Sequence, residues 1–132
     1  MRSSGPVIKG VAPLKKILIV DDEVHLVKIL EFTLQHAGFE VISCHNGHEA
    51  VEMIISEKPD LAILDLMLPG LDGFEVCRRI KGDERVSAIP VIMLSARDYS
   101  EEGLEGSLPA ESLMRKPFNT DKLIQTIREL TG

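Results

Sequence analysis

Short apolar runs alternate along the chain with stretches in which apolar residues recur every three or four positions. The apolar runs predict five strands, at residues 16–20, 40–44, 61–64, 91–94 and 113–115. Because most positions within these runs are apolar, the strands are expected to be covered on both faces. Strands that alternate with helices form parallel βαβ units, so the pattern predicts an α/β fold with a doubly wound sheet.

The periodic stretches predict amphipathic helices near 23–37 and 73–81, and two more that begin after Asn46 and Asn119. Asn46, Asp72 and Asn119 are suited to cap helix starts, and Gly38 to stop the first helix. One face of the first helix carries Leu26, Ile29, Leu30, Thr33 and Leu34, and periodicity leaves open whether Leu26, Ile29 and Leu30 belong to the core or to an interface with another protein. The expected buried faces of the other helices are Ala50, Val51, Ile54 and Ile55 in the second, Phe74, Cys77 and Ile80 in the third, and Leu123, Ile124, Ile127 and Leu130 in the last.

The segment YSEEGLEGSLPAES, residues 99–112, is the weakest helix candidate. Gly103, Gly106 and Pro109 fall inside it. In a helix interior, glycine is less favourable than alanine by about 1 kcal/mol and proline by about 3 kcal/mol. Leu104 and Leu108 are the only strong apolar anchors of the segment. A helix here is therefore expected to be short or disordered.

The chain of 132 residues is long enough for one domain with its own core. Residues 1–14 contain serine, glycine and proline without periodicity, so we expect a flexible tail there and a domain at 15–132. A net charge of −6, with one tyrosine and no tryptophan, argues against direct nucleic acid binding. No apolar run approaches the roughly 18 residues of a membrane span, so a cytoplasmic protein without membrane insertion is expected.

Polar residues follow the ends of four predicted strands. Asp21 and Asp22 follow the first strand, Asp65 the third, Ser95 the fourth and Lys116 the fifth. Each of these residues alone is more often a cap, a turn residue or a solvated side chain. In a parallel sheet, however, the carboxyl ends of the strands share one edge, where ligands bind. The combination therefore indicates a functional site at that edge.

Asp21, Asp22 and Glu23 place three carboxylates in succession, and a nearby cation is needed to offset their repulsion. Carboxylate oxygens suit a hard divalent cation such as Mg²⁺ or Mn²⁺. A metal, a hydroxyl and an ammonium group around one carboxylate favour phosphoryl transfer, with Asp65 as the acceptor.

The stretches ILIVDDE, LAILDLMLPGLDG, VIMLSA and RKPF resemble, in order, the motifs of the receiver domain of two-component response regulators. The resemblance runs from about residue 15 to residue 130, and it is to single-domain receivers of the chemotaxis kind. It implies a five-stranded parallel sheet in the order 2-1-3-4-5 with helices on both faces. It also implies a phosphoacceptor signalling domain rather than a turnover enzyme.

By this resemblance, Asp65 is the phosphoacceptor and also a metal ligand. Asp22 and the backbone carbonyl of Met67 would bind Mg²⁺ directly, and Asp21 would bind it through water. Ser95 and Lys116 would each bind a phosphoryl oxygen.

The phosphoryl donor would be a sensor histidine kinase or a histidine phosphotransfer protein, docked on the first helix and the loops around the site. The receiving downstream protein is unknown. The Lys116–Pro117 peptide bond is expected to be cis.

The sequence departs from the family on the output face, the surface that changes its partners after phosphorylation. The position that usually holds the aromatic switch residue, three before Lys116, holds Leu113. Phosphorylation is therefore hypothesised to act on the loop after Ser95 rather than through an aromatic side chain. Met67 and Arg97 flank the site, and they are predicted to shield the acyl phosphate from water.

Three other functions fit the pattern less well. A phosphatase with an aspartate nucleophile would usually carry a second acid two residues after it, where Met67 stands. A nucleotide- or flavin-binding domain would need a glycine-rich loop after the first strand, where the chain reads DDEVH. A degenerate receiver that binds proteins independently of phosphorylation is the remaining alternative.

Overall fold

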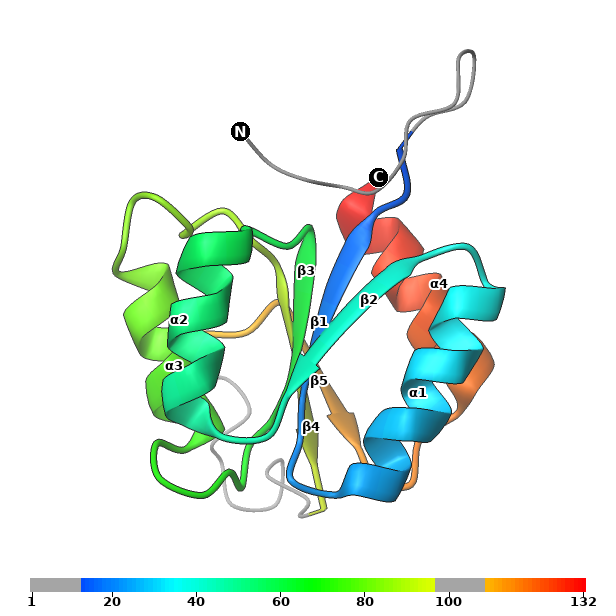
Figure 1. The fold of residues 1–132 in the computed structure, drawn as a ribbon, viewed down its shortest axis with the longest axis horizontal. Helices are drawn as coiled ribbons and strands as arrows, with labels where there is room; N and C mark the ends of the chain where they lie inside the picture. The colour runs from blue at the N-terminus through cyan, green and yellow to red at the C-terminus, as the bar shows by residue number, and fades with distance from the viewer. Residues whose placement is uncertain (1–12, 97–108) are drawn as a thin grey trace.

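The structure is a computed structural model that describes residues 13–96 and 109–132 (Figure 1). Its elements, in chain order, are β1 (Lys16–Val20), α1 (Val24–His36), β2 (Glu40–Cys44), α2 (Gly47–Glu57), β3 (Leu61–Asp65), α3 (Gly73–Lys81), β4 (Val91–Ser95), β5 (Ser112–Arg115) and α4 (Thr120–Thr131). All five predicted strands are present, and their ends differ from the predicted ones by at most one residue.

The strands form one parallel sheet in the order β2-β1-β3-β4-β5, which confirms the expected topology. Helices α1 and α4 cover one face of the sheet, and α2 and α3 cover the other (Figure 1). The inner strand β1, which lies between β2 and β3, is buried at every position. Its side chains alternate between the two layers, with Ile17 and Ile19 in the core beneath α1 and α4, and Leu18 and Val20 in the core beneath α2 and α3. The sheet is therefore covered on both faces, as predicted.

The three predicted helix caps are confirmed. The side chain of Asn46 accepts a hydrogen bond from the backbone N–H of Glu49, and Asp72 accepts one from Glu75. Asn119 caps α4 in the same way. These caps satisfy backbone donors that have no partner within the helix.

The structure decides one position that the sequence left open, Ile29, and shows that the predicted core position Phe74 is wrong. Ile29 is 61% exposed, because α1 turns Val27, Leu30 and Leu34 toward the sheet. Phe74 is 37% exposed, whereas Val76 is fully buried. In both helices, apolar residues occupy a wider arc than the face that touches the sheet, and periodicity alone does not show which edge of the arc is covered.

Part of the sequence-based prediction concerns residues that lie outside the described ones. These include most of the expected tail at 1–14, most of the segment 99–112, and Arg97. Leu113 is described, and it packs partly buried against the core beneath α2 and α3. Within 13–96 and 109–132, every helix is too short or too polar to cross a membrane.

Candidate functional site

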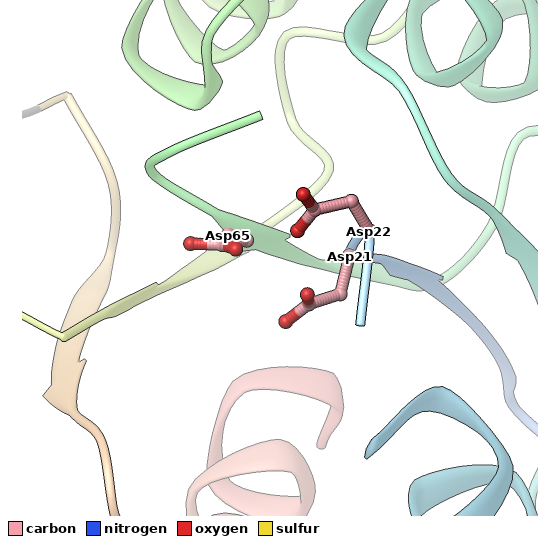
Figure 2. A group of neighbouring side chains, drawn as sticks. All are labelled: Asp21, Asp22 and Asp65. Atoms are coloured by element: carbon pink, nitrogen blue, oxygen red, sulfur yellow. The ribbon is translucent and has the colours of Figure 1, made fainter. Parts of the chain in front are cut away.

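Three carboxylates meet where β1 and β3 end (Figure 2). Oxygen atoms of Asp21, Asp22 and Asp65 all lie within 4.8 Å of one another. Asp21 is fully buried and Asp65 is 5% exposed, whereas Asp22 is exposed. The predicted acidic cluster is thus assembled by the sheet edge, with one side open to solvent.

Two glycines hold the loop after Asp65 in place. A β-carbon on Gly73 would stand 2.3 Å from the carbonyl oxygen of Asp65, and one on Gly47 would stand 1.8 Å from the carbonyl oxygen of Leu71. The starts of α3 and α2 therefore approach this loop more closely than any other residue would allow. Neither role is predictable from the sequence, because each depends on a contact between residues that are not neighbours along the chain.

Met67 lies in this loop and holds the Asp65 carboxylate in place. Its backbone N–H donates a hydrogen bond of 3.1 Å to Oδ1 of Asp65. Its side chain is 58% exposed beside the site. The structure thus brings Met67 to Asp65, and metal binding by its carbonyl group stays a prediction.

Lys116 reaches the acidic cluster from the end of β5. Its Nζ atom lies 2.8 Å from Oδ2 of Asp21 and 3.4 Å from Oδ2 of Asp65. A third contact of 3.0 Å joins it to Oε1 of Glu23. The cation that the three successive carboxylates required is therefore present in the chain itself. The predicted cis peptide bond between Lys116 and Pro117 is confirmed.

Ser95 lies at the same sheet edge and is fully buried. It is the last residue of β4, and its carbonyl oxygen accepts a hydrogen bond of 2.6 Å from the backbone N–H of Lys116. This bond ties the ends of β4 and β5 together. Ser95 and Lys116 are therefore held side by side, as the strand pattern predicted.

Burial and charge shift the pKa values of the two central groups. Burial raises the pKa of Asp65 and the charge of Asp21 raises it further, against the opposing effects of the Met67 N–H and Lys116. For Lys116, burial lowers the pKa, but the hydrogen bonds to Asp21 and Glu23 outweigh it, so the pKa is raised. Lys116 is thus a permanent positive charge at neutral pH.

The donor set fits a hard divalent cation. It consists of carboxylate oxygens only, which Mg²⁺ and Mn²⁺ prefer. The open side at Asp22 leaves the site accessible to the waters that Mg²⁺ usually keeps. A metal-competent cluster next to a buried carboxylate and an ammonium group is suited to bind and stabilise a phosphoryl group on Asp65.

Comparison with known proteins agrees with this geometry. The response regulator receiver domain family matches residues 17–128. The response regulator protein TrrA from Thermotoga maritima, solved in complex with Mg²⁺ and BeF, is 34% identical with a TM-score of 0.79, and the match covers 89% of this chain and 99% of that one.

Receiver domains of two sensor kinases are also similar. That of a signal transduction histidine kinase from Syntrophus aciditrophicus is 30% identical with a TM-score of 0.82, and the match covers 89% of each chain. That of sensor histidine kinase PA1611 from Pseudomonas aeruginosa, with a magnesium ion in its active-site cleft, is 25% identical with a TM-score of 0.82 over 90% of this chain and 98% of that one. The family match spans most of the chain and the site lies where the motifs predicted it, so this protein belongs to the receiver domains of two-component response regulators.

Proposed function

We propose that Asp65 is the phosphoacceptor of this receiver domain. The donor would be a phosphohistidine on a sensor histidine kinase or a histidine phosphotransfer protein. A carboxylate oxygen of Asp65 forms a bond to phosphorus while the P–N bond breaks, and the electron pair of that bond stays on the imidazole nitrogen. The supporting observation is the position of the Asp65 carboxylate, which has an oxygen within 4.8 Å of oxygens of the other two acids and lies 3.4 Å from Lys116 Nζ.

The residues around Asp65 would have separate roles. The Met67 N–H holds one carboxylate oxygen in place. Lys116 offsets the negative charge of the phosphoryl oxygens, and the Ser95 hydroxyl donates a hydrogen bond to one of them. A Mg²⁺ or Mn²⁺ ion bound by Asp21, Asp22, Asp65 and the Met67 carbonyl would supply further positive charge. Each chain takes one phosphoryl group, so the domain acts as a signalling acceptor and not as a turnover enzyme.

The donor would dock beside α1. A groove of about 450 Å³ runs from Glu23 and Lys116 along Leu26, Ile29 and Phe118. Ile29 and, one helical turn further, Phe32 are more than half exposed, and exposed apolar surface beside a reactive group favours a protein partner. The downstream partner stays undefined, and the cytoplasm is the expected compartment. The alternative, a module that works without phosphorylation, is not favoured because the acceptor, hydroxyl, lysine and acidic cluster are all in place.

The test is the intact mass of the protein after incubation with acetyl phosphate, with and without Mg²⁺. We expect wild type to gain one phosphoryl group only with Mg²⁺, and Asp65→Asn to gain none. Asp121→Asn is the matched control, because Asp121 is an exposed acid in the first turn of α4. No gain in wild type, or an equal gain in Asp65→Asn, would contradict the proposal.

A further inference from the structure

Glu23 is the one acid of the DDE stretch that the proposed metal site leaves unused. It precedes α1 as its N-cap residue, yet its side chain makes no cap hydrogen bond. Instead, its Oε1 atom lies 3.0 Å from Lys116 Nζ. The side chain therefore serves the lysine and not the helix.

The contacts of Lys116 are unequal. An ammonium group has three N–H donors, and the three acceptors near Nζ are Asp21 at 2.8 Å, Glu23 at 3.0 Å and Asp65 at 3.4 Å. The longest contact is the one to the acceptor. Asp21 and Glu23 thus hold the ammonium group toward the end of β1, away from the atom that would carry the phosphoryl group.

The Glu23 contact is the one that can open most readily. The Glu23 side chain is 62% exposed, whereas the Asp21 side chain is fully buried. Water can solvate Glu23 when Lys116 leaves, but it cannot reach Asp21 in the same way. A phosphoryl oxygen on Asp65 that accepts a hydrogen bond from Lys116 would therefore replace Glu23, and not Asp21, as a partner of the ammonium group.

We infer that Glu23 is a positioning residue that holds Lys116 in a resting position and competes with the phosphoryl group for it. This inference rests on the proposed phosphorylation of Asp65. Phosphorylation would transfer the ammonium group from Glu23 to the phosphoryl oxygen, and hydrolysis would return it. Removing the Glu23 charge should accelerate phosphorylation, because Lys116 is then free to follow the incoming group.

The test measures the rate constant of phosphorylation by acetyl phosphate at saturating Mg²⁺ and low ionic strength. Glu23→Gln should raise it about two- to fivefold, the range expected for loss of one exposed ion pair, and the gain should shrink in high salt. Glu84→Gln removes an exposed acid in the turn after α3 and should leave the rate unchanged. In a Lys116→Met background, Glu23→Gln should have no effect.

A second readout needs neither metal nor transfer. The ¹H–¹⁵N signal of the Lys116 ammonium group in metal-free protein should move in Glu23→Gln and stay in place in Glu84→Gln. The inference is overturned if Glu23→Gln leaves the Lys116 signal in place or the rate constant unchanged. It is also overturned if Glu23→Gln raises the rate constant equally in the Lys116→Met background, because that result would show only repulsion between Glu23 and an anionic donor. If wild type gains no phosphoryl group, the proposed function fails together with the inference.

Discussion

Gly47, the first residue of α2, lies directly against Leu71 in the loop that follows Asp65. A β-carbon at position 47 would stand 1.8 Å from the carbonyl oxygen of Leu71, and the backbone N–H of Gly47 points at Pro69 in the same loop, 3.5 Å from its carbonyl oxygen. The start of α2 is thus a support for the loop that carries Met67. The contact joins backbone to backbone, so a clash created by a side chain at position 47 could not be relieved by a change of rotamer.

Gly47→Ala should therefore displace the loop beside the acidic site, although residue 47 is not one of the site residues. The loop must move away, and we expect a loss of about 1–3 kcal/mol in the free energy of unfolding together with weaker Mg²⁺ binding. Urea unfolding and a Mg²⁺ titration followed by NMR would measure the two effects. Gly82→Ala is the control, because a β-carbon there makes only ordinary contacts from 3.4 Å. Equal behaviour of the two variants would contradict the support role.

Asp65→Asn should stabilise the metal-free protein at neutral pH. The pKa of Asp65 is raised by burial and by Asp21, so the folded state binds its proton more tightly than the unfolded state does. A raised carboxyl pKa lowers stability as pH rises from the unfolded value through the folded one. Above that window the charged group destabilises the fold, and asparagine removes this effect.

Urea unfolding of Asp65→Asn and wild type at pH 7 and at acidic pH checks this prediction. The two curves should converge at low pH, where Asp65 is protonated, and Mg²⁺ should narrow the gap at pH 7 because it stabilises only wild type. Asp83→Asn should have the opposite effect on stability. Hydrogen bonds from Arg85 lower the pKa of Asp83 to about 2. The small stabilisation by the charged Asp83 carboxylate is therefore present above the unfolded pKa and is lost as pH falls toward 2. A wild type that is more stable than Asp65→Asn at pH 7 without metal would refute the argument.

The gathering of the site residues at one edge was predictable, because a parallel sheet brings the carboxyl ends of its strands together irrespective of side-chain conformation. Asp21, Asp65 and Lys116 follow from that rule alone. The Glu23–Lys116 contact was not predictable, because it depends on a side-chain direction across the site. The packing of Leu113 against the core likewise shows only in the structure, and Arg97 lies outside the described residues.

Ile29 and Leu30 are adjacent in α1 but differ in burial, at 61% and 1% exposed. Leu30→Ala should cost about 2–5 kcal/mol in the free energy of unfolding because it leaves a cavity. Ile29→Ala should stay within about 0.5 kcal/mol of wild type, as exposed positions do. Urea unfolding of both variants measures the difference. A large loss in Ile29→Ala would favour the core over the interface for Ile29, the two alternatives that the sequence left open.

Lys116→Met should lower the free energy of unfolding of the domain without metal. With Mg²⁺ present, the loss should be smaller. Without the ammonium group, Asp21 is a fully buried carboxylate beside Asp65 with no cation. Removal of one partner of a buried ion pair costs up to roughly 3–5 kcal/mol. A divalent ion supplies the missing positive charge and no longer competes with the lysine, so the variant should gain more stability from Mg²⁺ than wild type gains.

Urea unfolding of Lys116→Met across a Mg²⁺ series, at neutral pH, is the measurement. Lys122→Met serves as the control, because Lys122 is an exposed lysine on α4, away from the three acids, and its removal should leave both the stability and the response to Mg²⁺ as in wild type. If Mg²⁺ stabilises Lys116→Met no more than wild type, then Lys116 and the metal do not compete for the same carboxylates. In that case the cation that offsets the successive acids after β1 would be the lysine alone.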